Sequence, residues 1–109
     1  MVARIWHGYT TINNADKYEA LLKTVVFPGI EAKQVKGFAS IQLLRRLLDD
    51  EVEFVTIMLF TSIADIKAFS GEDYEKAYVP AQAREILARF DERAQHYEVE
   101  EHRVYGQPA

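Results

Sequence analysis

The segment from Glu51 to Thr61 limits the fold most strongly, because both of its faces are apolar. Side chains alternate between the two sides of a β-strand. One face carries Val52, Phe54, Thr56, Met58 and Phe60, and the other carries Val55, Ile57 and Leu59. An antiparallel sheet normally leaves one face to water. This strand needs a cover on each side, and the helices of one small chain can supply only one.

The length and composition predict a single globular domain. The chain has 109 residues, of which 49% are hydrophobic and 28% charged, and one domain commonly takes roughly 100–200 residues. We expect the domain to span residues 1–105 and a flexible tail to span 106–109.

The first half of the chain predicts a strand, a helix and a hairpin. Val2–Tyr9 is rich in β-branched and aromatic residues and predicts the first strand. Asn13 or Asn14 is a suitable helix cap, and Pro28-Gly29 should break or distort the helix, with a further turn through Ala32. The expected buried face of this helix comprises Tyr18, Leu21, Leu22, Val25 and Val26. Two extended segments, Phe38–Leu48 and Glu51–Thr61, flank a polar Asp49-Asp50 turn and predict an antiparallel hairpin.

The second half predicts two short helices and a last strand. Ser62-Ile63-Ala64-Asp65 has the form of a capping box, Ile66 and Phe69 continue the helix, and Gly71 should end it. Asp73–Tyr78 is expected to form a helical turn. Pro80 suits the first position of the final helix, whose inward residues should be Ala83, Ile86, Leu87 and Phe90. Gln95–Val99 predicts the fourth strand.

The order of elements is therefore β-α-β-β-α-β, which is the ferredoxin-like α+β arrangement with an antiparallel sheet. Helices should cover one face of this sheet. The economical way to bury the other face is a two-fold partner, so we expect a homodimer.

Charge and residue usage exclude several classes of function. The net charge is −4, which argues against nucleic acid as a partner. No apolar run is long enough to cross a membrane, and the segment Met1–His7 lacks the apolar region of a leader peptide. Cysteine is absent, which excludes disulfides and Cys-ligated metal centres and suits a reducing compartment. We expect a cytoplasmic protein without a membrane partner.

His7 is the sharpest candidate for a catalytic residue. Strand alternation sets it on one face with Ala3, Ile5 and Tyr9, and sets Trp6 on the other face. An imidazole titrates near neutral pH, so His7 is a candidate general base. The alternative reading is a histidine held by a backbone carbonyl at the edge of the core. Trp6 is either a wall of an aromatic pocket or a core residue.

Potential metal ligands alternate along the last strand, namely His96, Glu98, Glu100 and His102. Neighbours on the same face of a strand lie about 6.6–7 Å apart, so at most two adjacent ones could share an ion. A solvated edge strand explains the pattern equally well, and we predict no metal site. The sequence has no GxGxxG or phosphate-binding loop, and we expect no cofactor.

Several segments together resemble the antibiotic biosynthesis monooxygenase domain family. They are Ala3–Gly8, Gly29–Glu31, Val35–Phe38, Ile66–Phe69 and His96–Val99, and the resemblance runs over about residues 2–100. It implies a ferredoxin-like subunit that pairs face to face into a dimeric α+β barrel. The family contains oxygenases that oxidise polycyclic phenols without metal or flavin, and relatives that degrade haem.

The haem-degrading members use an Asn, a Trp and a His at positions that correspond here to His7, Phe69 and Val79. None of the three matches, so the resemblance argues against haem degradation.

A cofactor-independent oxygenase acting on a small, electron-rich aromatic or enolisable substrate remains the leading prediction. It needs a base, an apolar pocket and exclusion of water. His7 is the candidate base, and the candidate pocket walls are Trp6, Phe69, Tyr74, Tyr78 and Tyr97. Each of these aromatic residues could instead be core packing. The alternative function is a homodimer that binds a small ligand, or serves a structural role, without catalysis.

Overall fold

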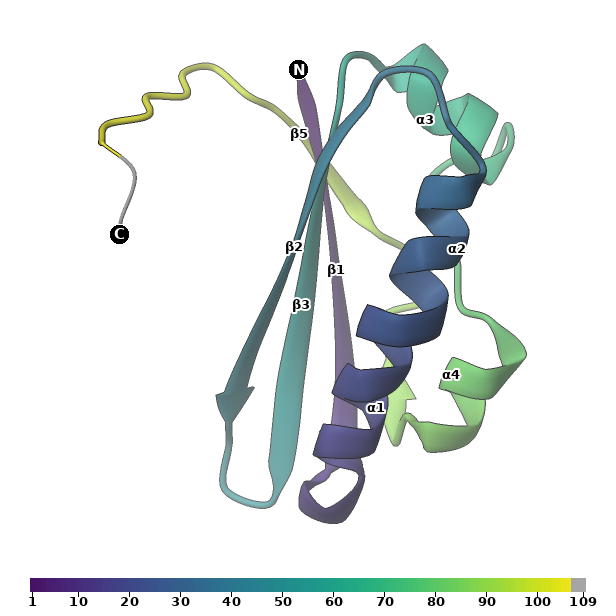
Figure 1. Cartoon of the computed structure of the whole chain (residues 1–109), viewed down its shortest axis with the longest axis vertical. Coiled ribbons are helices and arrows are strands. Elements are labelled where there is room, and N and C mark those ends of the chain that lie inside the picture. Colours follow the sequence, from purple (N-terminus) through teal and green to yellow (C-terminus); the bar gives the residue numbers. More distant parts are fainter. Residues whose placement is uncertain (107–109) are drawn as a thin grey trace.

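One antiparallel sheet forms the centre of the molecule, and all the helices lie on one of its faces (Figure 1). The structure, a computed structural model, describes residues 1–106. The predicted tail 106–109 therefore lies outside the described residues except for Gly106. Residues 99–106 form no helix or strand, and Figure 1 shows this segment running away from the end of the sheet.

The sheet has the order β2-β3-β1-β4, and β5 pairs with β1 on the same edge as β4. The strands are β1 (Val2–Thr11), β2 (Phe38–Leu47), β3 (Glu51–Phe60), β4 (Arg89–Phe90) and β5 (Gln95–Glu98). Every pairing is antiparallel. The ferredoxin-like prediction is confirmed, with the two-residue β4 as an addition that the sequence did not suggest.

Asn14 precedes the first helix, as expected, but its side chain makes no capping hydrogen bond, and Thr11 caps a 3₁₀ turn that comes before the helix. The Thr11 hydroxyl accepts a hydrogen bond from the Asn14 backbone N–H at 3.3 Å. A 3₁₀ turn (Ile12–Asn14) leads into α1 (Ala15–Leu21). Thr11 thus satisfies one of the backbone donors that a helix start leaves without an acceptor.

Pro28 distorts this helix without breaking it. A π-helical turn (Leu22–Val26) joins α1 to α2 (Phe27–Ala32), and the three pieces run on continuously. The wider turn suits the missing proline N–H. It also shifts the residues that follow around the helix axis, so Val26 and Ile30 are buried. Val25, expected in the buried face, is exposed instead.

The capping of α3 (Ile63–Ser70) follows the prediction. The Ser62 hydroxyl accepts from the Asp65 backbone N–H at 3.2 Å and lies 3.1 Å from the Asp65 carboxylate, to which it donates. Gly71 ends the helix with a φ of 93°, a conformation that favours glycine.

The final helix is shorter than expected. Asp73–Tyr78 forms turns rather than a helix, and α4 spans Ala81–Ile86, with Pro80 just before its first residue. The chain becomes extended at Leu87, so Phe90 lies in β4 and not in the helix. The physical reason is competition from β1. The Ala88 and Asp91 backbone N–H groups donate to carbonyls of β1 at 2.8 and 3.0 Å.

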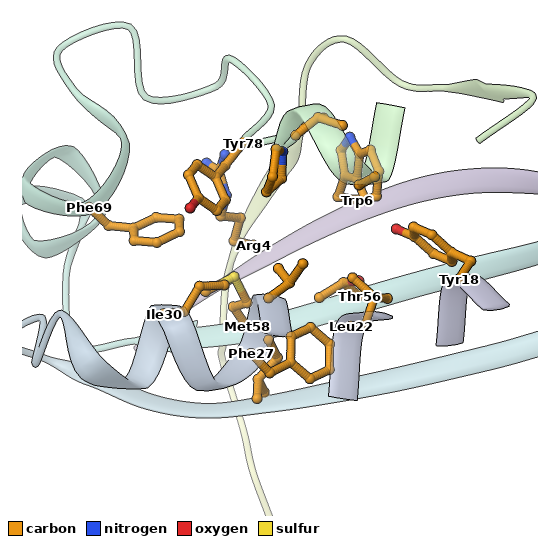
Figure 2. Close-up of a pocket in the computed structure, with 15 residues that line it drawn as sticks. Arg4, Trp6, Tyr18, Leu22, Phe27, Ile30, Thr56, Met58, Phe69 and Tyr78 are labelled. Carbon is orange, nitrogen blue, oxygen red and sulfur yellow. The ribbon is translucent and has the colours of Figure 1, made fainter. Parts of the chain in front are cut away.

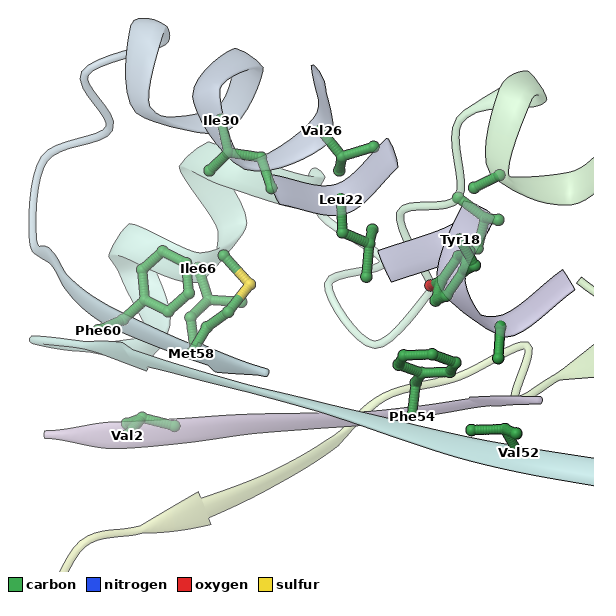
Figure 3. Packing of buried hydrophobic residues seen from close by; sticks show 13 residues of the cluster. Val2, Tyr18, Leu22, Val26, Ile30, Val52, Phe54, Met58, Phe60 and Ile66 are labelled. Carbon is green, nitrogen blue, oxygen red and sulfur yellow. The ribbon is translucent and has the colours of Figure 1, made fainter. Parts of the chain in front are cut away.

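The hydrophobic core fills the space between the sheet and the helices (Figure 3). Phe54 packs edge to face against Tyr18 of α1, with ring centroids 4.9 Å apart. The largest fully buried apolar side chains are Tyr18, Phe54, Phe60 and Ile66. The helices therefore cover the Val52–Phe60 face of β3.

The opposite face of the sheet carries no helix formed by residues 1–106, and we call it the open face. Register places Val55 beside His7 and Leu44, and Ile57 beside Ile5. Leu44 is 45% exposed. Thus both faces of β3 are apolar, as the sequence indicates, and the chain's own helices cover one of them. In residues 1–106 no helix is long and apolar enough to cross a membrane.

Candidate functional site

A narrow apolar cavity, which we call the slot, lies between the sheet and the helices (Figure 2). Its volume is about 50 Å³. β1 and β3 form its floor, and α2 and the π-helical turn form one wall. The lining is mostly aliphatic and aromatic, including Leu22, Val26, Phe27, Ile30, Ile41 and Met58. At this size the slot admits a ligand only after its walls move apart.

Arg4 is the one charged residue in the lining, and it is 4% exposed. Its guanidinium donates to the carbonyl oxygens of Tyr74 and Lys76, the latter at 3.0 Å. Burial lowers the pKa of Arg4 to about 10, so the side chain is still charged at neutral pH. Figure 2 shows Arg4 with Phe69 and Tyr78 at one end of the slot, and Tyr18 at the other.

His96 lies behind Arg4, away from the lining. Its Nε2 is 2.9 Å from a guanidinium nitrogen of Arg4. Because arginine can only donate, this ring nitrogen accepts, and the neutral imidazole carries its hydrogen on Nδ1. Burial, followed by the charge of Arg4, lowers the pKa of His96 and favours this neutral form. Nδ1 is buried without a hydrogen-bond partner among the described residues.

Trp6 is fixed in place on the floor of the slot. Its indole N–H donates to the Asp91 carbonyl at 2.6 Å. A Cβ on Gly8 would lie 3.0 Å from the indole and 3.1 Å from Leu87, so only glycine leaves room for the ring to lie over the strand at this point. Trp6 therefore presents a preset aromatic surface.

The structure brings together three of the predicted pocket residues, namely Trp6, Phe69 and Tyr78. The Phe69 and Tyr78 rings are 5.5 Å apart. Tyr74 is not in the lining: its carbonyl holds Arg4, and its ring packs against His96 at 5.1 Å. Tyr97 is 56% exposed on the edge strand β5, outside the slot.

His7 is on the open face, with the sheet between it and the slot. Its Nδ1 is 3.0 Å from the Glu53 carboxylate, which also accepts from Tyr9 at 3.3 Å and from Arg46. A shallow depression of about 380 Å³ lies beside this cluster. His7 and Trp6 are therefore not parts of one site within a chain, and a catalytic role for His7 stays a prediction.

The possible metal ligands of the last strand do not converge. No group of three His, Cys, Asp or Glu side chains suited to a metal occurs in the described part of the chain. His96 is instead the partner of Arg4. Of the positions that correspond to the haem-degrading residues, Phe69 and Val79 line the slot, whereas His7 does not.

Sequence reasoning missed Arg4, and it considered His96 only as a possible metal ligand rather than as the partner of Arg4. One signal was available, because alternation places a charged Arg4 on the same face of the first strand as Val2 and Trp6. A lone charge on a face that helices cover indicates either an ion pair or a site. The pairing with His96 arises only from the register of β5 on β1.

The Glu53 cluster yields a prediction about stability. Hydrogen bonds from Arg46, and then from His7, lower the pKa of Glu53. A lowered carboxyl pKa stabilises the fold above the unfolded-state pKa of about 4.3, and this contribution is lost as the pH falls through the lower folded-state value. Glu53→Gln should therefore reduce the free energy of unfolding at pH 7 by about 1–3 kcal/mol. The difference in free energy of unfolding between the wild-type protein and the variant should become smaller below pH ~4, as measured by urea unfolding.

Glu85→Gln provides the control, because Glu85 is exposed on α4. It should leave the free energy of unfolding within about 0.5 kcal/mol of the wild-type value. A Glu53→Gln deficit that is constant with pH would contradict the assigned cause.

Comparison with known proteins identifies the fold. No family model matches the chain, and no curated protein matches it. Among solved structures, the chain is similar to the crystal structure of a putative antibiotic biosynthesis monooxygenase from Bacillus cereus. The TM-score is 0.62 and the sequence identity 11%, over 98% of this chain and 98% of that one. At this identity the likeness concerns the fold alone: the chain has the ferredoxin-like α+β fold of that structure.

Proposed function

We propose that the protein is a monooxygenase that oxidises a small, electron-rich aromatic or enolisable substrate in the slot, without a metal or an organic cofactor. The single observation that carries this proposal is the apolar slot between sheet and helices, with Trp6 on its floor and Phe69 and Tyr78 at one end. Likeness of fold to the Bacillus cereus protein supports it. A fold by itself does not determine a reaction.

The chemistry follows from the electronic structure of oxygen. Ground-state O₂ is a triplet and reacts slowly with closed-shell organic molecules. A phenolate or enolate is electron-rich enough to pass one electron to O₂ and then combine with the resulting superoxide. A substrate CH₂ group becomes a carbonyl in this way, with one oxygen atom entering the product and the other leaving as water. The two C–H bonds of that carbon supply the four electrons that O₂ takes up, so no separate reductant is required.

The residues of the slot would bind and orient the substrate and exclude water. Trp6 offers a fixed ring against which an aromatic substrate can stack. Phe69 and Tyr78 lie at the end where Lys33 sits 4.4 Å above the Tyr78 ring. Tyr78 is 41% exposed, so this end is the side from which a ligand would enter.

The part of His7 in this proposal depends on where the substrate binds. As a general base, His7 would need a substrate on the open face, in the depression beside Glu53. For a substrate in the slot, His7 would be too remote to take a proton directly. The slot is the better site, because aromatic side chains line it on several sides.

A second candidate function is ligand binding without turnover. The observation that favours it is the lining of the slot, which contains no histidine and no carboxylate among its fifteen residues. Such a lining can hold a ligand and offers no side chain that takes a proton from it. The two functions differ in whether O₂ is consumed.

For either function we propose that the open face pairs with a second copy of the chain. Ile5, Val55, Ile57 and Leu59 give this face an apolar centre, and the cluster around Glu53 gives it fixed charges. Burial of such a face against its copy would remove on the order of 2,000 Å² from water, which is typical of an obligate dimer. A two-fold interface is also self-complementary by symmetry.

Oxygen uptake tests the proposed reaction. With 1,5-dihydroxynaphthalene as an electron-rich phenol, an oxygen electrode should record uptake above that of a protein-free control. Trp6→Leu should lower the protein-dependent rate about 10-fold or more, because the substrate loses its orienting surface. Val25→Ala, on the exposed side of the helix, should leave it unchanged.

Uptake equal to the protein-free control, across several phenols that bind to the protein, would leave ligand binding without turnover as the function. Equal loss of rate in Trp6→Leu and Val25→Ala would show that oxidation does not take place in the slot.

Analytical ultracentrifugation tests the pairing. The wild-type protein should sediment as a dimer at micromolar concentration, and Ile57→Asp should sediment as a folded monomer. Each interface would then bury two unpaired carboxylates, which is strongly unfavourable, whereas the core on the other side of the sheet is untouched.

Ile12→Asp is the matched control, because Ile12 is 53% exposed and lies at the start of the helical segment. It should remain a dimer. A wild-type protein that is monomeric at micromolar concentration would contradict the pairing.

A further inference from the structure

Arg4 is a buried cation without an acidic partner. Within residues 1–106, no carboxylate pairs with it, and burial is the sole cause of its lowered pKa. The groups around it are two backbone carbonyls and the neutral imidazole of His96. A buried charge that lacks an opposite charge is costly to the fold. Such a residue therefore needs an explanation beyond stability.

The hydrogen bonds of Arg4 leave part of the guanidinium available. Two N–H groups on one terminal nitrogen face the Tyr74 carbonyl and His96 Nε2, and one on the other nitrogen faces the Lys76 carbonyl. Arginine has five N–H groups. Two of them have no acceptor among the described residues, and the side chain lines the slot.

The surroundings of Arg4 favour an anion over a neutral ligand. Arg4 is the only charged residue of the lining. Two cations lie near the Phe69 ring, with the Arg4 guanidinium 5.9 Å and the Lys33 ammonium 5.6 Å from its centroid. The positive end of the slot is thus the end nearest its entrance, although the chain as a whole has a net charge of −4.

We propose that the slot binds its ligand as an anion, with a carboxylate, phenolate or enolate oxygen on Arg4 and an apolar ring against Trp6. This inference rests on the proposed function, since it takes the slot as the substrate site, and it adds the charge class of the substrate. Two N–H groups of one guanidinium can donate together to both oxygens of a carboxylate. They can equally donate to the single oxygen of a phenolate or enolate.

The proposal explains how the substrate could ionise in a slot without a base. A cation in hydrogen-bond contact with a phenol or enol oxygen favours its ionised form, as it does for a carboxyl group. The proton would leave to solvent water, and the bound anion would be the electron-rich species that O₂ requires. His96 acts as a positioning residue here, because it accepts from one edge of the guanidinium, while two N–H groups elsewhere on it have no acceptor among the described residues.

Three probes with one skeleton test the charge class: phenylacetate, 2-phenylethanol and 2-phenylethylamine. They carry an anion, a neutral hydroxyl and a cation, and none is an oxidisable phenol. Trp6 is the only tryptophan of the chain, so its fluorescence reports directly on the slot. Phenylacetate should bind about 10- to 100-fold more tightly than 2-phenylethanol, as expected for a charge-assisted hydrogen bond. The amine should not bind.

Arg4→Gln should abolish the preference for phenylacetate, and Arg103→Gln, at an exposed arginine that pairs with Glu101 outside the slot, should preserve it. If Arg4→Gln does not fold, the order of the affinities of the three probes for the wild-type protein still tests the charge class of the ligand. Equal binding of acid and alcohol, no binding of phenylacetate at millimolar concentration, or a preference that survives Arg4→Gln would each overturn the proposal. Binding of phenylacetate without phenol-dependent oxygen uptake would support the anion site and contradict the proposed oxidation.

Discussion

The fold depends on one constraint: a sheet with two apolar faces receives helices on only one of them. Because side chains alternate along β1, neighbours in sequence are assigned to different environments. Trp6 faces the helices and becomes part of the slot, whereas His7 faces the open side and joins Glu53. In the functions that we propose, the covered face binds the ligand and the open face pairs with a second copy of the chain.

The slot is built around a charge that the core does not neutralise. Carbonyls from the turn between α3 and α4 and the imidazole of His96 hold Arg4, and none of these groups removes its charge. An apolar residue at this position would avoid the cost of burying a cation. Natural proteins commonly retain such a cost at functional sites. This is the physical reason to place the site at Arg4 rather than at His7.

The sequence predicted those parts of the structure that local rules determine. The hairpin, the Ser62 cap, the Gly71 end of α3 and the two-faced β3 follow from alternation, capping and turn chemistry. Local rules failed where tertiary contacts compete. The α4 helix ends early because backbone groups after Leu87 bond to β1. Arg4 and His96 lie opposite each other because β5 pairs with β1 in this register. No local sequence pattern predicts that pairing. Alternation did separate His7 from Trp6, yet both were assigned to one candidate site.

The most direct test of the account is the NMR response of the three histidine rings to phenylacetate, because each ring reports on a different place. His96 contacts Arg4, His7 lies on the open face, and His102 borders the open face after β5. The account predicts that phenylacetate shifts the His96 ring resonances in a saturable manner and leaves those of His7 and His102 unchanged. A saturable shift of His7 with no change at His96 would place the ligand on the open face and contradict the account.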